Sequence, residues 1–157
     1  PQIAVPARRM SQNPWSESWC KVGINQKVRV IPFSDTMTGH VRVEKITVVQ
    51  DVGRVVNRLG LEGQIEGGIA MSIGYGLSED LRIEDGIVRN PSFRDYKLMT
   101  STELPEIEYH FIENDDPEGP FGAKGIAELP AIVPAPAIAN AVAIASLTCG
   151  LTGAVAL

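Results

Sequence analysis

The chain has 157 residues, of which 44% are hydrophobic and 21% charged, and its mean hydropathy is +0.03. These values predict one soluble globular domain with a substantial core, and they are not typical of disordered or membrane proteins. The net charge of −5 argues against nucleic-acid binding, because no basic surface is available to contact phosphates.

The first half of the chain opens with a segment of weak periodicity. Residues 1–25 contain several loop formers, so we expect an arm or linker before a domain that comprises residues 26–157. Polar and apolar residues alternate at 26–34 and again at 40–50, which predicts a β-hairpin with one buried face. The sequence DVGRVVN, 51–57, predicts a glycine turn out of the second strand.

Residues 58–79 predict a glycine-rich helix. Apolar residues recur every four positions, at Leu61, Ile65, Ile69, Ile73 and Leu77. The same segment holds the glycines Gly63, Gly67, Gly68, Gly74 and Gly76. Each glycine disfavours a helix by about 1 kcal/mol relative to alanine, so their number indicates that another backbone packs very close. Core packing of the helix explains most of them, and burial against a cofactor is the alternative.

The second half continues with short elements. Residues 81–90 predict a hairpin around an Asp-Gly turn, and residues 93–98 fit either strand or helix. An alternating strand, 106–113, precedes a solvated acidic loop, 114–120, and 135–147 predict an alanine-rich helix. Strands and helices follow one another without a regular β–α–β alternation, which predicts an α+β fold.

The strongest chemical candidate is GPFGAKGIAELP, residues 119–130. Its glycines can leave backbone N–H groups facing an anion or a tightly packed ligand. Glu128 has apolar neighbours and is a candidate general base; alternatively, it satisfies backbone donors at the start of the next helix. Lys124 is a salt-bridge partner of Glu128, a contact to an anionic ligand, or an ordinary surface lysine.

Metal ligation by side chains is not predicted. Two cysteines, Cys20 and Cys149, cannot supply the four thiolates of an iron–sulfur site, and the two histidines give no zinc spacing. The N-terminal residues are not a signal peptide and no segment reaches transmembrane length, so we expect a cytoplasmic protein without a membrane partner.

Five stretches of the sequence together resemble a known family. They are VVQDVGRVVN, LEGQIEGGIAMSIGYGLSED, NPSFRDYKL, LPEIEYHFIE and GPFGAKGIAELPAIVPAPAIANAV. The same order is found in the xanthine oxidase family of molybdenum hydroxylases, which includes aldehyde oxidoreductases and nicotinate and isoquinoline dehydrogenases. The resemblance covers about residues 40–143, and it implies the C-terminal portion of the molybdopterin-binding domain in the large subunit.

That resemblance also implies a function. It implies an oxidoreductase that inserts water-derived oxygen into a C–H bond of an aldehyde or an N-heterocycle, with Glu128 in the position of the catalytic base. The cofactor would be molybdopterin with molybdenum, expected in its cytosine dinucleotide form. The helix segment 64–68 would lie beneath the site. The loop expected to bind the cofactor consists of Gly122, Ala123, Lys124 and Gly125.

The chain is too short for the whole enzyme that the resemblance implies. We therefore expect partners: the rest of the molybdenum-binding subunit, an iron–sulfur subunit and an FAD subunit, with a small molecule as substrate. Two departures from the family are Asn57-Arg58, in place of asparagine-proline, and the divergent end SLTCGLTGAVAL. The missing first half of the molybdenum domain and the divergent end motivate an alternative function, a non-catalytic interaction or assembly module that keeps the fold but binds no cofactor.

Overall fold

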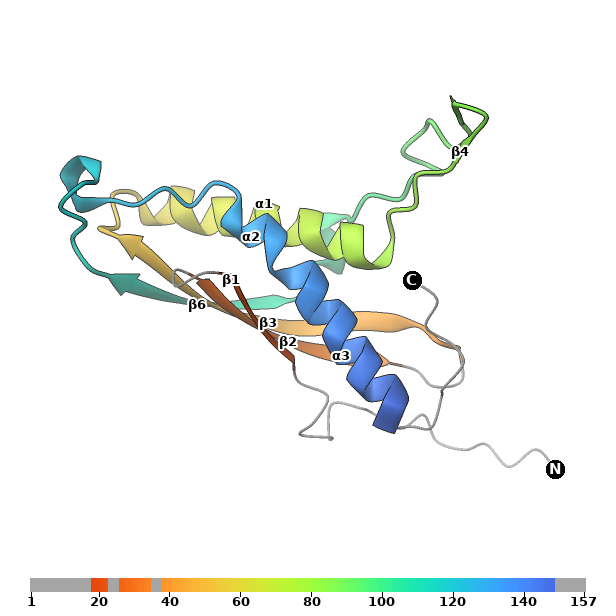
Figure 1. The fold of residues 1–157 in the computed structure, drawn as a ribbon, viewed down its shortest axis with the longest axis horizontal. Helices are drawn as coiled ribbons and strands as arrows, with labels where there is room; N and C mark the ends of the chain where they lie inside the picture. Colours follow the sequence, from red (N-terminus) through yellow and green to blue (C-terminus); the bar gives the residue numbers. More distant parts are fainter. Residues whose placement is uncertain (1–17, 23–25, 35–37, 149–157) are drawn as a thin grey trace.

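The structure is a computed structural model that describes residues 18–22, 26–34 and 38–148. Figure 1 shows two layers, with the long helices on one face of a β-sheet. In chain order the strands and α-helices are β1 (Ser18–Val22), β2 (Gln26–Ser34), β3 (Val41–Gly53), α1 (Arg58–Leu77), β4 (Ile83–Glu84), β5 (Ile87–Val88), β6 (Glu106–Glu113), α2 (Leu129–Ile132) and α3 (Pro134–Thr148). Single turns of 3-10 helix lie at Ser101–Glu103 and Pro120–Gly122. This mixture confirms the predicted α+β class.

The larger sheet has the strand order β1-β2-β3-β6. β1, β2 and β3 are antiparallel neighbours, whereas β6 lies parallel to β3, and α1 belongs to the connection between them. The hairpin predicted for 26–34 and 40–50 is confirmed as β2 and β3. The strand predicted for 106–113 is confirmed as β6, which forms one edge of the sheet.

β1 falls within residues 1–25, for which we expected an arm, and it pairs with β2 as the other edge of the sheet. The rest of that segment lies outside the described residues, as do Cys149 and most of the divergent end. In the part of the chain that the structure describes, no helix has the length and apolar character needed to cross a bilayer.

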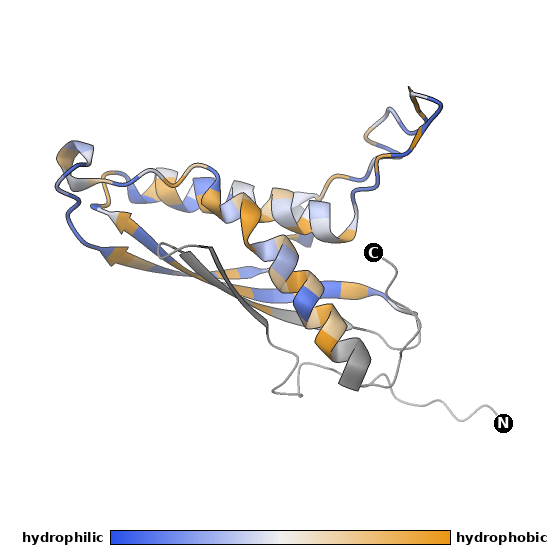
Figure 2. Ribbon diagram, in the orientation of Figure 1, coloured by the Kyte–Doolittle hydropathy of each residue, from blue (hydrophilic) through white to orange (hydrophobic). Residues whose placement is uncertain are grey.

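The core lies between the sheet and the helices. Figure 2 shows that α1 and α3 both carry apolar residues among more polar ones. β3 contributes Ile46 and Val48, and α1 contributes Ile65, Ile69 and Ile73, all at most 1% exposed. Full burial of each such side chain stabilises the fold by about 1.5–3 kcal/mol, so this interface fixes α1 on the sheet.

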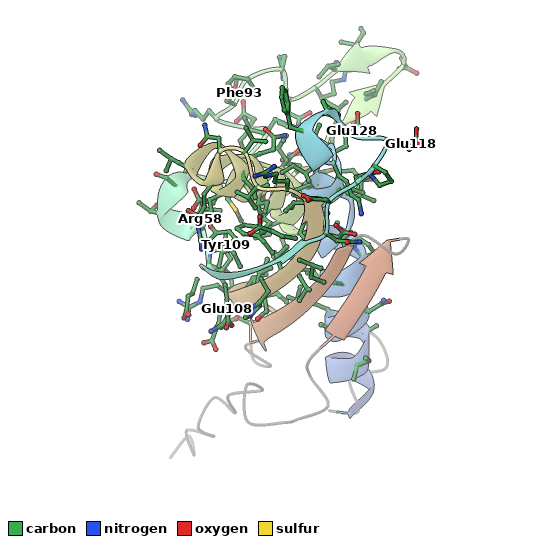
Figure 3. The ribbon with its side chains drawn as sticks, turned by 90° about the vertical axis from the view of Figure 1, so that its left-hand side faces the viewer. Arg58, Phe93, Glu108, Tyr109, Glu118 and Glu128 are labelled. Atoms are coloured by element: carbon green, nitrogen blue, oxygen red, sulfur yellow. The ribbon has the colours of Figure 1, made fainter. Side chains whose placement is uncertain are left out.

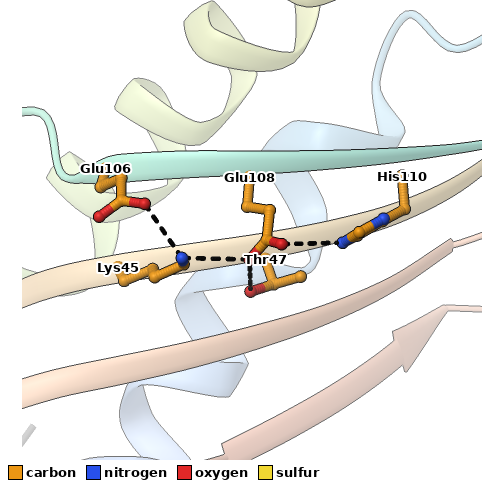
Figure 4. A network of polar contacts seen from close by, with 5 residues as sticks. All are labelled: Lys45, Thr47, Glu106, Glu108 and His110. Carbon is orange, nitrogen blue, oxygen red and sulfur yellow. Dashed lines mark hydrogen bonds and ion pairs between the residues drawn. The ribbon is translucent and has the colours of Figure 1, made fainter.

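The opposite face of the sheet carries a polar cluster where β3 pairs with β6. Lys45 Nζ lies 3.0 Å from a Glu106 oxygen and 3.1 Å from a Glu108 oxygen (Figure 4). Glu108 also accepts from Thr47 Oγ1 at 3.3 Å and lies 3.2 Å from His110 Nε2. These bonds to the two glutamates raise the pKa of Lys45. The contacts join β3 to β6 and support the register of the parallel pair.

The predicted helix at 58–79 is confirmed as α1, which begins after Asn57. The Asn57 side chain accepts a hydrogen bond from the Gly60 N–H at 3.0 Å and so caps the helix. The predicted close approach of another backbone to this helix is confirmed at Gly68, where a Cβ atom would lie 2.6 Å from Pro130 Cβ. Core packing therefore explains Gly68, whereas Gly63 and Gly67 face space in which a Cβ atom would meet nothing within 4 Å.

The segment between α1 and β6 carries the second predicted hairpin. β4 and β5 flank Asp85 and Gly86, whose φ angles of 53° and 76° suit a tight hairpin turn. Residues 93–98 form turns rather than the expected strand or helix. Their polar groups bond back to the end of α1: Tyr96 donates to Glu79 at 2.6 Å, and the Lys97 carbonyl accepts from Ser78 Oγ at 3.0 Å. These bonds hold the segment against the residues that follow α1.

Candidate functional site

The loop 119–125 lies against the end of β3. The Lys124 N–H donates to the Val52 carbonyl at 3.0 Å, and the Arg54 N–H donates to the Gly122 carbonyl at 2.8 Å. Gly53 lies between these two bonds with a φ of 63°, and a Cβ atom there would overlap the Gly122 carbonyl oxygen. Only glycine suits this position, which lets the loop pack directly on the strand.

An ion pair strengthens the same junction. Lys124 Nζ lies 2.7 Å from Asp51 Oδ2, and the two side chains are 22% and 18% exposed. The other carboxylate oxygen of Asp51 accepts from the Gly53 N–H at 3.1 Å. The hydrogen bond from Lys124, supported by the Gly53 N–H, lowers the pKa of Asp51. Lys124 therefore forms an ion pair, as one alternative predicted, but its partner is Asp51 rather than Glu128.

Glu128 immediately precedes α2 and is exposed. Its side chain makes no capping hydrogen bond, so the helix-capping alternative is wrong for this side chain. Within the described residues its carboxylate has no hydrogen bond or ion pair. Figure 3 shows Glu128 at the start of α2, well apart from Glu108 on the sheet. The carboxylate is thus available to a ligand or substrate from outside this chain.

The backbone donors of the loop divide into two groups. The N–H groups of Gly122, Ala123 and Lys124 donate within the chain, to the carbonyls of Gly119, Pro120 and Val52. Among the described residues, the N–H groups of 125–128 have no such acceptor. A Cβ atom on Gly125 would also meet nothing within 4 Å. The backbone N–H groups without an acceptor in this part of the structure therefore begin at Gly125. The N–H groups of the three residues before it hold the loop in its conformation and against β3.

Helix α1 supports the segment that carries Glu128. Gln64 Nε2 donates to the Ala127 carbonyl at 2.8 Å, and Ser72 Oγ accepts from the Ala135 N–H at 2.8 Å. Sequence reasoning placed Gln64 only in the helix beneath the site, and it missed Asp51. No local pattern signals either contact, because each joins residues more than 60 positions apart.

Direct metal ligation by side chains has no candidate in the described ranges, where no group of three or more His, Cys, Asp or Glu residues is arranged to hold an ion.

Comparison with known proteins identifies the family. A family model described as a molybdopterin cofactor-binding domain matches residues 33–105. A putative xanthine dehydrogenase molybdenum-binding subunit of Escherichia coli (strain K12) is 42% identical over 108 residues, which are 68% of this chain and 14% of the relative. An aldehyde oxidoreductase of Megalodesulfovibrio gigas is 35% identical over 109 residues, 69% of this chain and 12% of the relative.

Solved structures agree with the sequence relatives. Quinoline 2-oxidoreductase from Pseudomonas putida 86 superimposes with a TM-score of 0.75 and 32% identity, over 80% of this chain and 16% of that one. The chain thus spans a small part of the length of each of these three proteins. Over that part, the chain belongs to the molybdenum-binding subunits of the xanthine oxidase family.

Proposed function

We propose that this chain supplies the catalytic base, Glu128, of a molybdenum-dependent hydroxylase that inserts water-derived oxygen into an aldehyde or an N-heterocycle. One observation carries the proposal: an exposed carboxylate without a partner among the described residues, on a segment tied to both β3 and α1. Family membership adds the chemistry, since the relatives are named as molybdenum-binding subunits and an aldehyde oxidoreductase.

The residues present fit a molybdopterin. A large cofactor needs bare backbone beside it, and Gly125 offers both an open Cβ position and an unused N–H group. We propose that the loop Gly122–Gly125 binds the cofactor, with Gly125 in contact and the preceding residues holding it in place. When bound, the cofactor would supply the redox-active metal that accepts the two electrons of the reaction, and water would supply the oxygen that is transferred.

Glu128 would act as a general base by accepting, at a carboxylate oxygen, the proton released as oxygen is transferred. A base must lie within hydrogen-bonding reach of that proton, so the backbone that carries it must be fixed. The bonds from Lys124 to Val52 and from Gln64 to Ala127 hold the segment on both sides of Gly125. The exposed carboxylate would meet the cofactor and the substrate on this fixed segment.

We also propose the assembly in which this chain works. Its partners would be the rest of the molybdenum-binding subunit, an iron–sulfur subunit and an FAD subunit, and its cofactor the cytosine dinucleotide form of molybdopterin in a cytoplasmic enzyme. Large apolar side chains support an assembly, since Leu59, Tyr75 and Phe121 are each more than three-quarters exposed. Exposed apolar surface of this kind commonly marks an interface.

The test is Glu128→Gln in the complete, molybdenum-loaded enzyme that contains this chain. Loss of a general base lowers a rate by about 10²–10⁴-fold, so we expect a fall in kcat of that size at unchanged molybdenum content. Glu118→Gln is the matched control, because Glu118 is another exposed carboxylate of the neighbouring loop (Figure 3). A Glu128→Gln enzyme that retains the wild-type rate at equal molybdenum content would contradict the proposal.

A further inference from the structure

One ridge of α1 follows the segment that carries Glu128. Gln64, Gly68 and Ser72 are spaced four apart and so lie along one ridge of the helix. These three residues contact the segment 127–135 one after another along the chain. Gln64 donates to the Ala127 carbonyl, and Gly68 packs on Pro130. Ser72 accepts from the Ala135 N–H. The helix thus guides the chain from just before Glu128 to the start of α3.

The contact of Gln64 acts on the peptide unit next to Glu128. The Ala127 carbonyl and the Glu128 N–H belong to one planar unit, so fixing the carbonyl oxygen at 2.8 Å orients the bond that leads into Glu128. The following unit is also fixed, because the Glu128 carbonyl accepts from the Ala131 N–H at 3.0 Å. With both flanking peptide planes held, the direction of the Glu128 Cα–Cβ bond is determined.

Gln64 itself is exposed and is not part of the apolar core. Packing alone therefore does not explain a long amide at this position, whereas the bond to Ala127 does. Gly68 supports the same arrangement from the next turn, because only a residue without a side chain lets Pro130 approach α1 so closely. We propose that Gln64 is a positioning residue, which sets the orientation of the Glu128 carboxylate through the Ala127 carbonyl.

This inference rests on the proposed role of Glu128, and its test is a double-mutant cycle in the complete, molybdenum-loaded enzyme. Gln64→Met keeps the length of the side chain and removes the donor. We expect kcat to fall about 10–100-fold, the effect of a misplaced catalytic group, with KM within about 3-fold and molybdenum content unchanged. Asn140→Met, which removes an exposed amide from α3, is the control and should stay within about 2-fold of the wild-type kcat.

The second arm adds Gln64→Met to Glu128→Gln. If Gln64 works through Glu128, the further fall in kcat should be less than about 2-fold. An equal fall in both backgrounds would overturn the positioning role, and so would loss of molybdenum in Gln64→Met alone. A wild-type rate in Gln64→Met beside a slow Glu128→Gln would refute this inference only. A wild-type rate in Glu128→Gln would refute the proposed function, and the positioning role with it.

Discussion

Asp51 and Lys124 are 73 residues apart in the sequence, and their ion pair fixes the loop 119–125 to the end of β3. The pair is only about one-fifth exposed, so it is less screened by solvent than a surface pair. Asp51 is also bonded to the Gly53 N–H, which places the carboxylate at the point where the strand and the loop meet. At the scale of single residues, this ion pair holds the loop 119–125 in place against β3.

We expect Asp51→Asn to lower the free energy of unfolding by about 1–2 kcal/mol near neutral pH, because the partly buried Lys124 loses its counter-charge. The control Glu118→Gln changes an exposed carboxylate and should have an effect below about 0.5 kcal/mol. Urea denaturation of the chain, monitored by circular dichroism, measures both.

The loss of stability caused by Asp51→Asn should depend on pH. Lys124 lowers the pKa of Asp51 in the folded chain, so the stabilisation is fully present above the ordinary aspartate pKa of about 3.9. It is lost as the pH falls through the lowered folded value, where Asp51 becomes protonated. The difference between wild type and Asp51→Asn should therefore shrink only in strong acid. A difference that stays constant from pH 7 down to pH 2 would argue against the ion pair.

Helix α1 has two glycine-bearing sides with different roles. One side, at Gly68, accepts Pro130 of α2 in close contact, and the other, at Gly63 and Gly67, faces open space. One side of the helix thus positions the segment that carries Glu128. The other side, at Gly63 and Gly67, has room for a larger side chain. At the scale of the element, the glycines of one helix do not share one explanation.

Alanine substitutions separate the two sides. Gly68→Ala places a methyl group against Pro130, so we expect it to lower the free energy of unfolding by about 1–3 kcal/mol. Gly63→Ala meets no atom, and the better helix propensity of alanine should raise stability by about 0.5–1 kcal/mol. Chemical denaturation of the two variants gives both values. Equal effects at the two positions would show that the close contact of α1 with α2 is absent.

The spacing of apolar residues was sufficient to predict most helices and strands. It did not predict the contacts between residues far apart in the sequence. Strict alternation predicted β2, β3 and β6, and the four-residue spacing predicted α1, because each pattern reports one buried face. The segment 93–98 has no clear periodicity, and the sequence left it undecided; in the structure it forms turns that bond to Ser78 and Glu79. The glycine-rich stretch 119–130 and the family resemblance pointed to Glu128, but Asp51 and Gln64 act through contacts that no local pattern encodes.

At the scale of the whole molecule, the four-stranded sheet of the described residues is covered on one face by helices (Figure 1). Glu128 lies outside the core and immediately precedes α2. The curated relatives named above extend far beyond it, since the chain spans 14% of one and 12% of the other. An exposed carboxylate without a partner among the described residues is suited to a site shared with other parts of an assembly. The alternative, an assembly module without cofactor, predicts the same fold but no molybdenum.

Molybdenum content separates these two functions most directly. We would purify the native assembly that contains this chain from its own host and measure molybdenum and pterin per copy of the chain. The proposed function predicts about one molybdenum and one pterin per copy, because each molybdopterin carries a single metal ion. An intact native assembly that contains neither would contradict the proposed function and establish the non-catalytic alternative.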